Sequence, residues 1–236
     1  MKTGYLVWIS FIFVGGFLFL TNSPWFGLKS VVLEGDWHND KKEQEKFFSS
    51  YWGKNIFKIP LQDIEGKIRE EPMVEKVRIE RRLPSELVVH SFWKKPVFLV
   101  NLDRIYGLTE SKEIIPISDG EQAYKYPIIT GLGLSSFNFY QQMHTQKANL
   151  CKKIYQAVTE VDPHLFTNIS EINLKDAENP VLFLLPFGVR VILGTGDYFL
   201  KIKRLKSVLA VEDLKEIKTI DLRFKDQALV KRKNKR

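Results

Sequence analysis

The chain has 236 residues, one cysteine and a net charge of +8 at neutral pH. Its length allows one or two compact domains, and 44% hydrophobic residues exclude global disorder. A single cysteine excludes an internal disulfide framework and a multi-cysteine zinc site. Five basic side chains stand among the last six residues, 231–236, so part of the excess charge belongs to a tail and not to a domain face.

An uncharged run, Tyr5–Leu20 (YLVWISFIFVGGFLFL), lies close to the N-terminus. With one more residue on each side, a helix here is about 27 Å long at 1.5 Å per residue. That length approaches the roughly 30 Å hydrocarbon core of a bilayer. Aromatic side chains stand near both ends, as they do at membrane–water interfaces. We therefore expect a transmembrane helix over residues 5–22, in contact with the lipid bilayer through Tyr5–Leu20, after a stub of residues 1–4.

Two other interpretations of this run are open. A cleaved signal peptide fits Lys2 and the small residues at 21–23, but the run is long, rich in bulky aromatics and followed by Pro24. A buried core helix is disfavoured because the run has no polar face. Lys2 and the amino group are the positive charges before the run, so the positive-inside rule favours a cytoplasmic N-terminus and an extracytoplasmic bulk.

The region after the apolar run alternates between strand and helix signals. Gly53-Lys54-Asn55 and Pro72 punctuate it, and Leu83-Pro84-Ser85 predicts a turn between two strands. The order strand, helix, helix, strand, strand predicts a small α+β domain over residues 27–95. The expected elements are strands at 27–33, 74–82 and from 87, and helices at 41–51 and 60–71.

A second region of short strands and two long helices follows over residues 96–231. Residues 135–161 contain a helix with Leu150, Ile154, Ala157, Val158 and Val161 on its apolar face. Together the regions predict an α+β protein whose second domain is a mixed β-sheet with helices. The expected strands are 98–101, 105–108, 113–117, 169–174, 181–185, 189–193, 218–224 and 227–231.

The second long helix, 197–210, has an amphipathic pattern. The pattern points Phe199, Ile202, Leu205 and Leu209 inward, and Lys201, Lys203, Arg204 and Lys206 outward.

Signals for catalysis are weak. Gly194-Thr195-Gly196 lies between a strand and a helix, but Phe199 occupies the position of the third glycine of a dinucleotide-binding loop. Cys151 has His144 seven residues before it and His164 thirteen after it, so a Cys–His nucleophile is conceivable. A cysteine packed in a helix is far more common. His38 and His90 have no metal-ligand spacing. We expect no enzyme activity, no metal and no cofactor.

The order of elements and their punctuation resemble the FtsQ/DivIB family of bacterial cell-division proteins. The resemblance covers nearly the whole chain. Its motifs are Val32-Leu33-Glu34-Gly35, Gly53-Lys54-Asn55-Ile56-Phe57-Lys58-Ile59, Pro72-Met73-Val74-Glu75-Lys76-Val77, Arg81-Arg82-Leu83-Pro84-Ser85-Glu86-Leu87, Pro127-Ile128-Ile129-Thr130-Gly131, Val191-Ile192-Leu193-Gly194 and Ile220-Asp221-Leu222-Arg223-Phe224.

The resemblance implies a single-pass inner-membrane protein at the division septum, with a POTRA-like domain over 27–95, an FtsQ-type β-domain over 96–231 and a basic tail, 232–236. It implies a divisome scaffold that links early and late division proteins and recruits FtsB-like and FtsL-like partners. Nucleic acid is not an expected partner of an exported domain. The alternatives are another POTRA-bearing export or assembly factor, or a membrane-tethered hydrolase that uses a carboxylate or Cys151.

The same resemblance implies a partner site at the last strand. Such a strand exposes unpaired backbone groups, to which a partner segment adds by β-augmentation. The POTRA-like domain is a second candidate surface. The tail is expected to be a solvated end, with anionic lipid and an acidic partner surface as alternatives. The expected partner-binding residues are Arg223, Phe224, Asp226, Gln227, Ala228, Leu229 and Val230.

Overall fold

The computed structural model divides the chain into two compact units, Met1–Lys94 and Lys95–Arg236. The structure describes residues 2–36, 41–117, 126–134 and 136–233, and of residues 2–7, 9, 10 and 41 it describes the backbone alone. The first unit contains α1 (Lys2–Asn22), η1 (Pro24–Phe26), β1 (Ser30–Gly35), α2 (Lys41–Phe48), η2 (Ser49–Tyr51), α3 (Leu61–Arg69), β2 (Val74–Arg82) and β3 (Glu86–Trp93).

The first unit begins with α1, which covers the uncharged run. Among the residues whose side chains the structure describes, no helix is both long enough and apolar enough to cross a membrane. The span predicted over residues 5–22 is therefore not confirmed by the fold.

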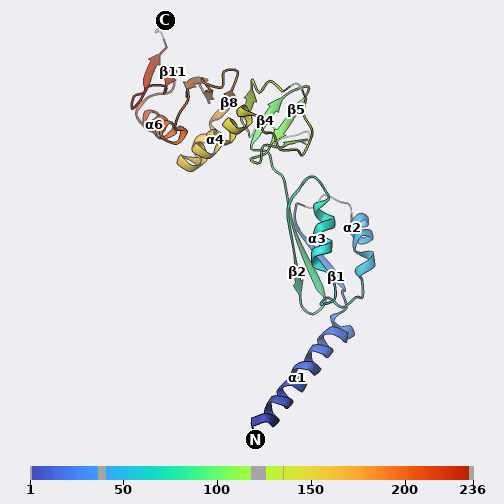
Figure 1. Cartoon of the computed structure of the whole chain (residues 1–236). Coiled ribbons are helices and arrows are strands. Elements are labelled where there is room, and N and C mark those ends of the chain that lie inside the picture. Colours follow the sequence, from blue (N-terminus) through green and yellow to red (C-terminus); the bar gives the residue numbers. More distant parts are fainter. Residues whose placement is uncertain (1, 37–40, 118–125, 135, 234–236) are drawn as a thin grey trace. The chain divides into compact units, whose positions relative to one another are not determined.

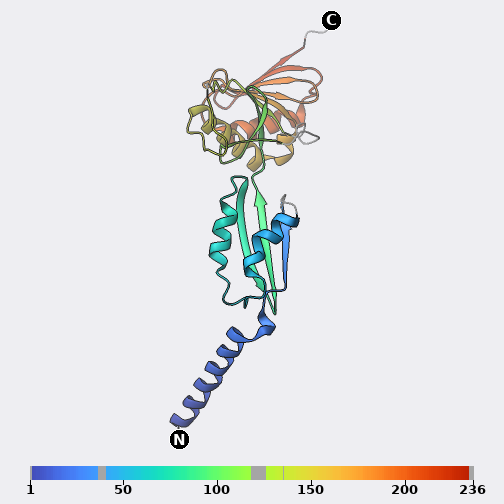
Figure 2. The same cartoon turned by 90° about the vertical axis from the view of Figure 1, so that its right-hand side faces the viewer.

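The three strands of the first unit form a sheet in the order β1-β3-β2, with β1 parallel and β2 antiparallel to β3. Helices α2 and α3 cover one face of this sheet (Figures 1 and 2). Their apolar positions, Phe48, Ile64 and Ile68, pack with Leu87 and Val89 of β3 in one buried core. The predicted order of strand, helix, helix, strand, strand is the observed order.

Glycine is required where the loop before α3 meets the start of the sheet. Gly53 has a φ of +75°, a backbone conformation that other residues rarely adopt. A Cβ on Gly27 would stand 3.0 Å from the Gly53 carbonyl oxygen. The two glycines therefore let the segments around them approach closely.

The second unit is built on a nine-stranded mixed sheet in the order β12-β11-β10-β9-β8-β7-β4-β5-β6. This sheet and the first unit confirm the predicted α+β class. The elements are β4 (Phe98–Asn101), β5 (Ile105–Leu108), β6 (Ile114–Ile115), β7 (Ile128–Thr130), α4 (Gln146–Val161), α5 (Pro163–Thr167), β8 (Ile169–Asn173), β9 (Val181–Leu184), β10 (Val189–Ile192), α6 (Tyr198–Val211), β11 (Ile217–Asp221) and β12 (Leu229–Arg232).

Helices α4 and α6 pack against each other, and their apolar side chains share one core with the sheet. Helix α4 starts at an N-cap, Thr145, whose hydroxyl accepts a hydrogen bond from the Ala148 N–H at 3.1 Å. Ile154 and Val158 of its predicted apolar face are fully buried. Figure 1 shows α6 next to β11 and α4 next to β8.

The two ends of this sheet differ. At β6, Ile114 forms a bridge to Phe139, and its carbonyl accepts a hydrogen bond from the Tyr140 N–H at 3.0 Å. Glu113 forms a further bridge to Gln142. Part of that edge is therefore covered by the segment 139–142. At the other end, β12 pairs with β11, and within the described ranges no strand lies on its outer side.

Candidate partner-binding edge

Strand β12 runs antiparallel to β11, with Leu229 opposite Asp221 and Val230 opposite Ile220. Just past the strand, the Lys233 N–H donates inward to the Glu216 carbonyl at 2.7 Å. Because N–H groups of an antiparallel strand alternate in direction, the N–H groups of Leu229 and Lys231 also face β11. The N–H groups of Val230 and Arg232 consequently face outward, away from the sheet.

The predicted partner-binding residues fall into two sets. Leu229 and Val230 belong to β12, and Leu229 is 51% exposed. Val230 and Ala228 are half-buried and pack against the core. The remaining predicted residues, Arg223, Phe224, Asp226 and Gln227, are exposed in the segment that joins β11 to β12.

Two predicted strand limits are wrong at this point. The strand expected over 218–224 ends at Asp221, and the strand expected over 227–231 begins only at Leu229. Asp226 has a φ of +59°, which is incompatible with an extended strand. Residues 224–228 therefore form a turn that exposes Phe224, which keeps 46% of its surface in solvent.

A buried lysine supports the start of this turn. Lys201 of α6 is 5% exposed, and its Nζ donates to the carbonyls of Leu193 at 2.5 Å and Leu222 at 3.2 Å. Burial lowers the pKa of this ammonium group, and the nearby Arg204 lowers it further, whereas Asp221 acts in the opposite direction. The outward position predicted for Lys201 is wrong, because these two carbonyls take up its charge.

Phe199 is the second error on α6. It was predicted to face the core, but it is half-buried outside the core, with the Lys203 ammonium 4.3 Å from its ring centroid. A cation over an aromatic face is a favourable contact, so the ring and the lysine cover each other on the helix surface.

Arg204, one turn after Lys201, fixes the middle of the turn. Its Nη1 donates to the carbonyls of Phe224 at 2.7 Å and Gln227 at 3.1 Å. Lys201 and Arg204 were not among the residues predicted for the site. Their spacing of three residues, which places them on one helix face, is the signal that was available.

An ion pair closes the end of β11. Arg223 donates through Nη2 to the Asp221 Oδ2 at 2.7 Å, and this hydrogen bond holds the pKa of the Asp221 carboxyl below its ordinary value. A Cβ on Gly194 would stand 2.7 Å from the Arg223 Cγ, so the glycine makes room for that side chain. Gly194 therefore serves the packing of Arg223 at the end of β11.

Salt bridges hold the far end of β12. Arg232 contacts Glu212 at 2.7 Å and Glu216 at 2.8 Å, through different nitrogens of its guanidinium group. The Lys233 ammonium lies 5.8 Å from the Phe187 ring centroid. Both ends of β12 are thus fixed by side chains, while its outer backbone groups face away from the sheet.

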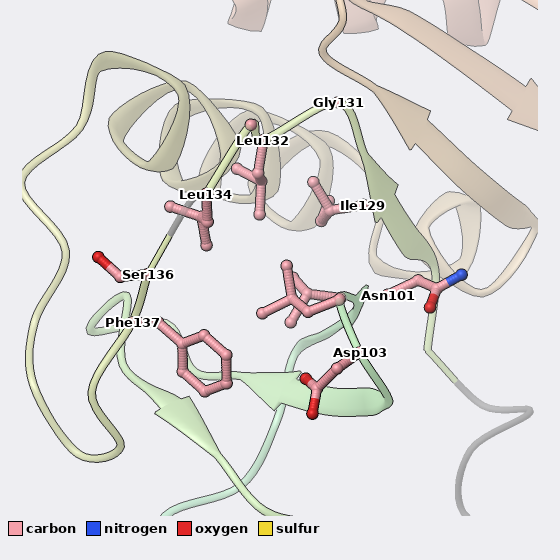
Figure 3. Close-up of a pocket in the computed structure, with 11 residues that line it drawn as sticks. Asn101, Asp103, Ile129, Gly131, Leu132, Leu134, Ser136 and Phe137 are labelled. Carbon is pink, nitrogen blue, oxygen red and sulfur yellow. The ribbon is translucent and has the colours of Figure 1, made fainter.

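A separate hollow of about 600 Å³ lies where β4 and β7 end. Figure 3 shows Phe137 and Asp103 at one side of it, with Ile129, Leu132 and Leu134 opposite. The Asp103 Oδ2 accepts a hydrogen bond from the Tyr106 hydroxyl at 3.1 Å. The lining thus mixes apolar side chains with polar groups, and Asp103 is the carboxylate among the lining residues.

The candidate nucleophile Cys151 is buried inside α4, and burial raises the pKa of its thiol to about 12. His144 precedes the N-cap Thr145, so it does not share a helix face with Cys151. A nucleophilic cysteine acts as an accessible thiolate, and this site favours the neutral thiol. Among the described residues, no group of three His, Cys, Asp or Glu side chains is placed to hold a metal ion.

The fold and this edge define a class: a two-unit α+β protein whose larger sheet ends in a strand with exposed backbone groups. The profile of the FtsQ/DivIB C-terminal domain of cell division proteins matches residues 101–223, more than half of the chain. The chain therefore belongs to the FtsQ/DivIB family of cell division proteins. The matched range ends just before Phe224, so the turn and β12 lie beyond it.

Curated relatives agree with this assignment. The cell division protein FtsQ of Geotalea daltonii is 28% identical over 191 residues, which cover 76% of this chain and 66% of that protein. The FtsQ of Syntrophotalea carbinolica is 22% identical over 83% of this chain and 69% of its own length. The FtsQ of Myxococcus fulvus is 24% identical over 88% of this chain and 72% of its own length. The chain thus spans about two thirds of the length of the relatives it matches.

Proposed function

We propose that this protein is a divisome scaffold that binds FtsB-like and FtsL-like division proteins through the outer edge of β12. Family membership supports a role in cell division, and the observation that carries the site is the exposed edge of the larger sheet. The outward N–H groups of Val230 and Arg232 can donate hydrogen bonds to the backbone carbonyls of a partner strand. Phe224 and Leu229 offer exposed apolar side chains beside them.

Assembly, and not turnover, is the proposed mechanism. The turn that precedes β12 is held by Lys201 and Arg204, so the edge is ordered before a partner arrives. An ordered edge lowers the entropy that a partner must lose on binding. The partner segment would add a tenth strand to the nine-stranded sheet, with backbone hydrogen bonds giving affinity and side chains giving specificity.

The proposal includes a membrane anchor. The backbone of Lys2–Asn22 is helical, and Tyr5–Leu20 carries no charged residue. We place this helix in the inner membrane, the POTRA-like domain (27–95) and the β-domain (96–231) outside the cytoplasm, and the whole protein at the septum. Confinement to the membrane raises the effective concentration of weakly binding partners.

Site-specific cross-linking tests the partner edge. A photoreactive amino acid is placed at Leu229 in the full-length protein, and adducts are collected from dividing cells. The matched control is Ile105 of β5, an apolar residue of similar exposure near the opposite end of the same sheet. We expect an adduct with an FtsB-like protein at Leu229 and none at Ile105. An adduct at Ile105 with none at Leu229 would place the partner elsewhere.

A further inference from the structure

Two segments far apart in the sequence meet just after the end of α1. Gly27 forms an antiparallel bridge with Asn55. The Leu28 N–H donates to the Lys54 carbonyl at 2.9 Å, and the Ile56 N–H donates to the Phe26 carbonyl at 2.8 Å. Residues 20–29 and 52–60 thus form one surface, which we call the collar.

Side chains tie the collar to the last turn of α1. The Asn55 Nδ2 donates to the Leu20 carbonyl at 2.8 Å, and the Asn55 Oδ1 accepts the Phe57 N–H at 3.0 Å. The Lys58 Nζ donates to the Asn22 Oδ1 at 3.0 Å. Because these bonds join the helix end directly to the loop before α3, the collar lies within a few residues of the end of the uncharged run.

Aromatic rings continue from the last turns of α1 into the collar. The Phe19 and Phe26 ring centroids are 6.3 Å apart, and those of Phe26 and Phe57 are 5.3 Å apart. Trp25 is 64% and Phe57 36% exposed, and Trp52 is exposed as well. Rings of this kind, continuous with an apolar helix, are typical of the headgroup level of a membrane.

The charge of the collar has one sign. It carries Lys29, Lys54 and Lys58, all exposed, and neither of its segments contains Asp or Glu. A neighbouring carboxylate, Glu86, forms an ion pair with Arg82 at 3.1 Å. Three lysines around exposed aromatic rings fit the negative surface of a bilayer that contains anionic lipid.

From these contacts we infer that the collar docks on anionic lipid headgroups and holds the first unit against the membrane surface. The inference rests on the membrane anchor proposed above. It adds that the folded unit itself contacts lipid, through residues that stand some thirty positions after the helix. The lysines give electrostatic attraction, and the rings bury apolar surface in the interface.

Tryptophan quenching tests this docking in the full-length protein. The protein is reconstituted into phosphatidylcholine vesicles, with or without phosphatidylglycerol, that contain brominated lipid as quencher. Three variants each contain a single tryptophan, with all other tryptophans replaced by phenylalanine. The first keeps Trp8, which reports the anchor. The second carries Phe57→Trp, which reports the collar. The third keeps Trp93, which lies at the other end of β3 from the turn that contacts Lys29.

We expect quenching of the Trp8 reporter and of the Phe57→Trp reporter, and no quenching of Trp93. Replacing Lys54 and Lys58 by Gln should lower the ratio of docked to undocked protein roughly fivefold per lysine with anionic lipid present. Lys42→Gln with Lys76→Gln is the matched control, because both lysines are exposed outside the collar. A variant that keeps only Trp52 repeats the collar measurement with a native residue.

Each other result overturns the docking. Quenching of Trp8 without quenching of Phe57→Trp or Trp52 would support the anchor but show that the collar does not contact lipid. Absence of Trp8 quenching would contradict the proposed membrane anchor, and with it the docking of the collar. Equal quenching of the collar reporters and Trp93 would show that the unit does not dock through the collar.

Discussion

Strands β2 and β12 each form the edge of a sheet, but their outward backbone groups have different surroundings. On β2, the Ile79 N–H donates to the Glu65 Oε1 at 3.1 Å, so a side chain from α3 already occupies one of its outward donors. Arg81, near the end of β2, donates to the carbonyls of Ile56 and Ile59. Within the described residues, no side-chain acceptor caps the outward N–H groups of Val230 and Arg232. Charged and capped edges resist strand addition, and exposed edges invite it.

Exposure of an edge strand alone is therefore not enough to make it a partner site. Arg78 and Glu80 of β2 form an ion pair at 2.8 Å and present charge along that strand. β12 carries charge as well, at Lys231 and Arg232, but Leu229 at its start presents an exposed apolar side chain. The partner edge is therefore expected where the outer donors and an apolar side chain occur together.

The largest change is expected from Lys201→Met, which keeps the length of the side chain and removes its donor. The carbonyls of Leu193 and Leu222 would then be left without this partner in a buried place. We expect a loss of about 2–6 kcal/mol in the free energy of unfolding, since each of the two unsatisfied carbonyls costs about 1–3 kcal/mol. Chemical denaturation measures it, and unchanged stability would show that Lys201 does not hold the turn.

A smaller effect is expected from Glu65→Ala, which uncaps β2. The half-buried Ile79 N–H loses its acceptor, at a cost of about 1–3 kcal/mol. Binding of a partner to β12 should not change, and sedimentation should reveal some self-association through the opened edge. Glu43→Ala on α2, an exposed carboxylate with no part in the cap, is the control. Lost partner binding in a folded Glu65→Ala protein would place the partner on β2.

The smallest effect is a pH dependence. The pKa of Lys201 is lower in the folded protein than its ordinary value of 10.5, chiefly because of burial. The unfolded chain then binds more protons between the lowered pKa and 10.5, so this group makes stability rise with pH in that window. Below both values the full cost of the buried charge remains. The free energy of unfolding, measured at several pH values in that window, should rise more steeply with pH in the natural protein than in Lys201→Met. Equal dependence on pH in the two proteins would contradict the assignment.

Much of the fold could be predicted from local pattern. The helix over α4, the hairpin of β2 and β3 and the break at Gly53 follow from periodicity and punctuation. The order of strands in the nine-stranded sheet could not, because it depends on contacts between distant segments. Lys201 was assigned to the surface because amphipathic patterns place every lysine outside, and its two carbonyl partners belong to other elements.

The partner site stays a prediction, and the turn inside it was not predicted from the sequence. The turn over 224–228 has no glycine or proline to mark it, and the positive φ of Asp226 is set by the surroundings. Among those surroundings is Arg204, which binds the carbonyls on either side of Asp226, at Phe224 and Gln227. The local pattern of residues 223–230 could not predict the contact with Arg204, which belongs to a helix about twenty residues earlier.

The central claim is that a partner pairs with the outer edge of β12, and Val230→Pro tests it most directly. This change removes an outward N–H without removing an inward one, and Val230→Ala is the matched control that keeps the N–H. Both variants must first show natural circular dichroism. In titrations with the FtsB-like partner, we expect Val230→Pro to bind at least about fivefold more weakly than Val230→Ala, the equivalent of roughly 1 kcal/mol for one hydrogen bond. Equal affinities of the two folded variants would contradict strand addition at β12.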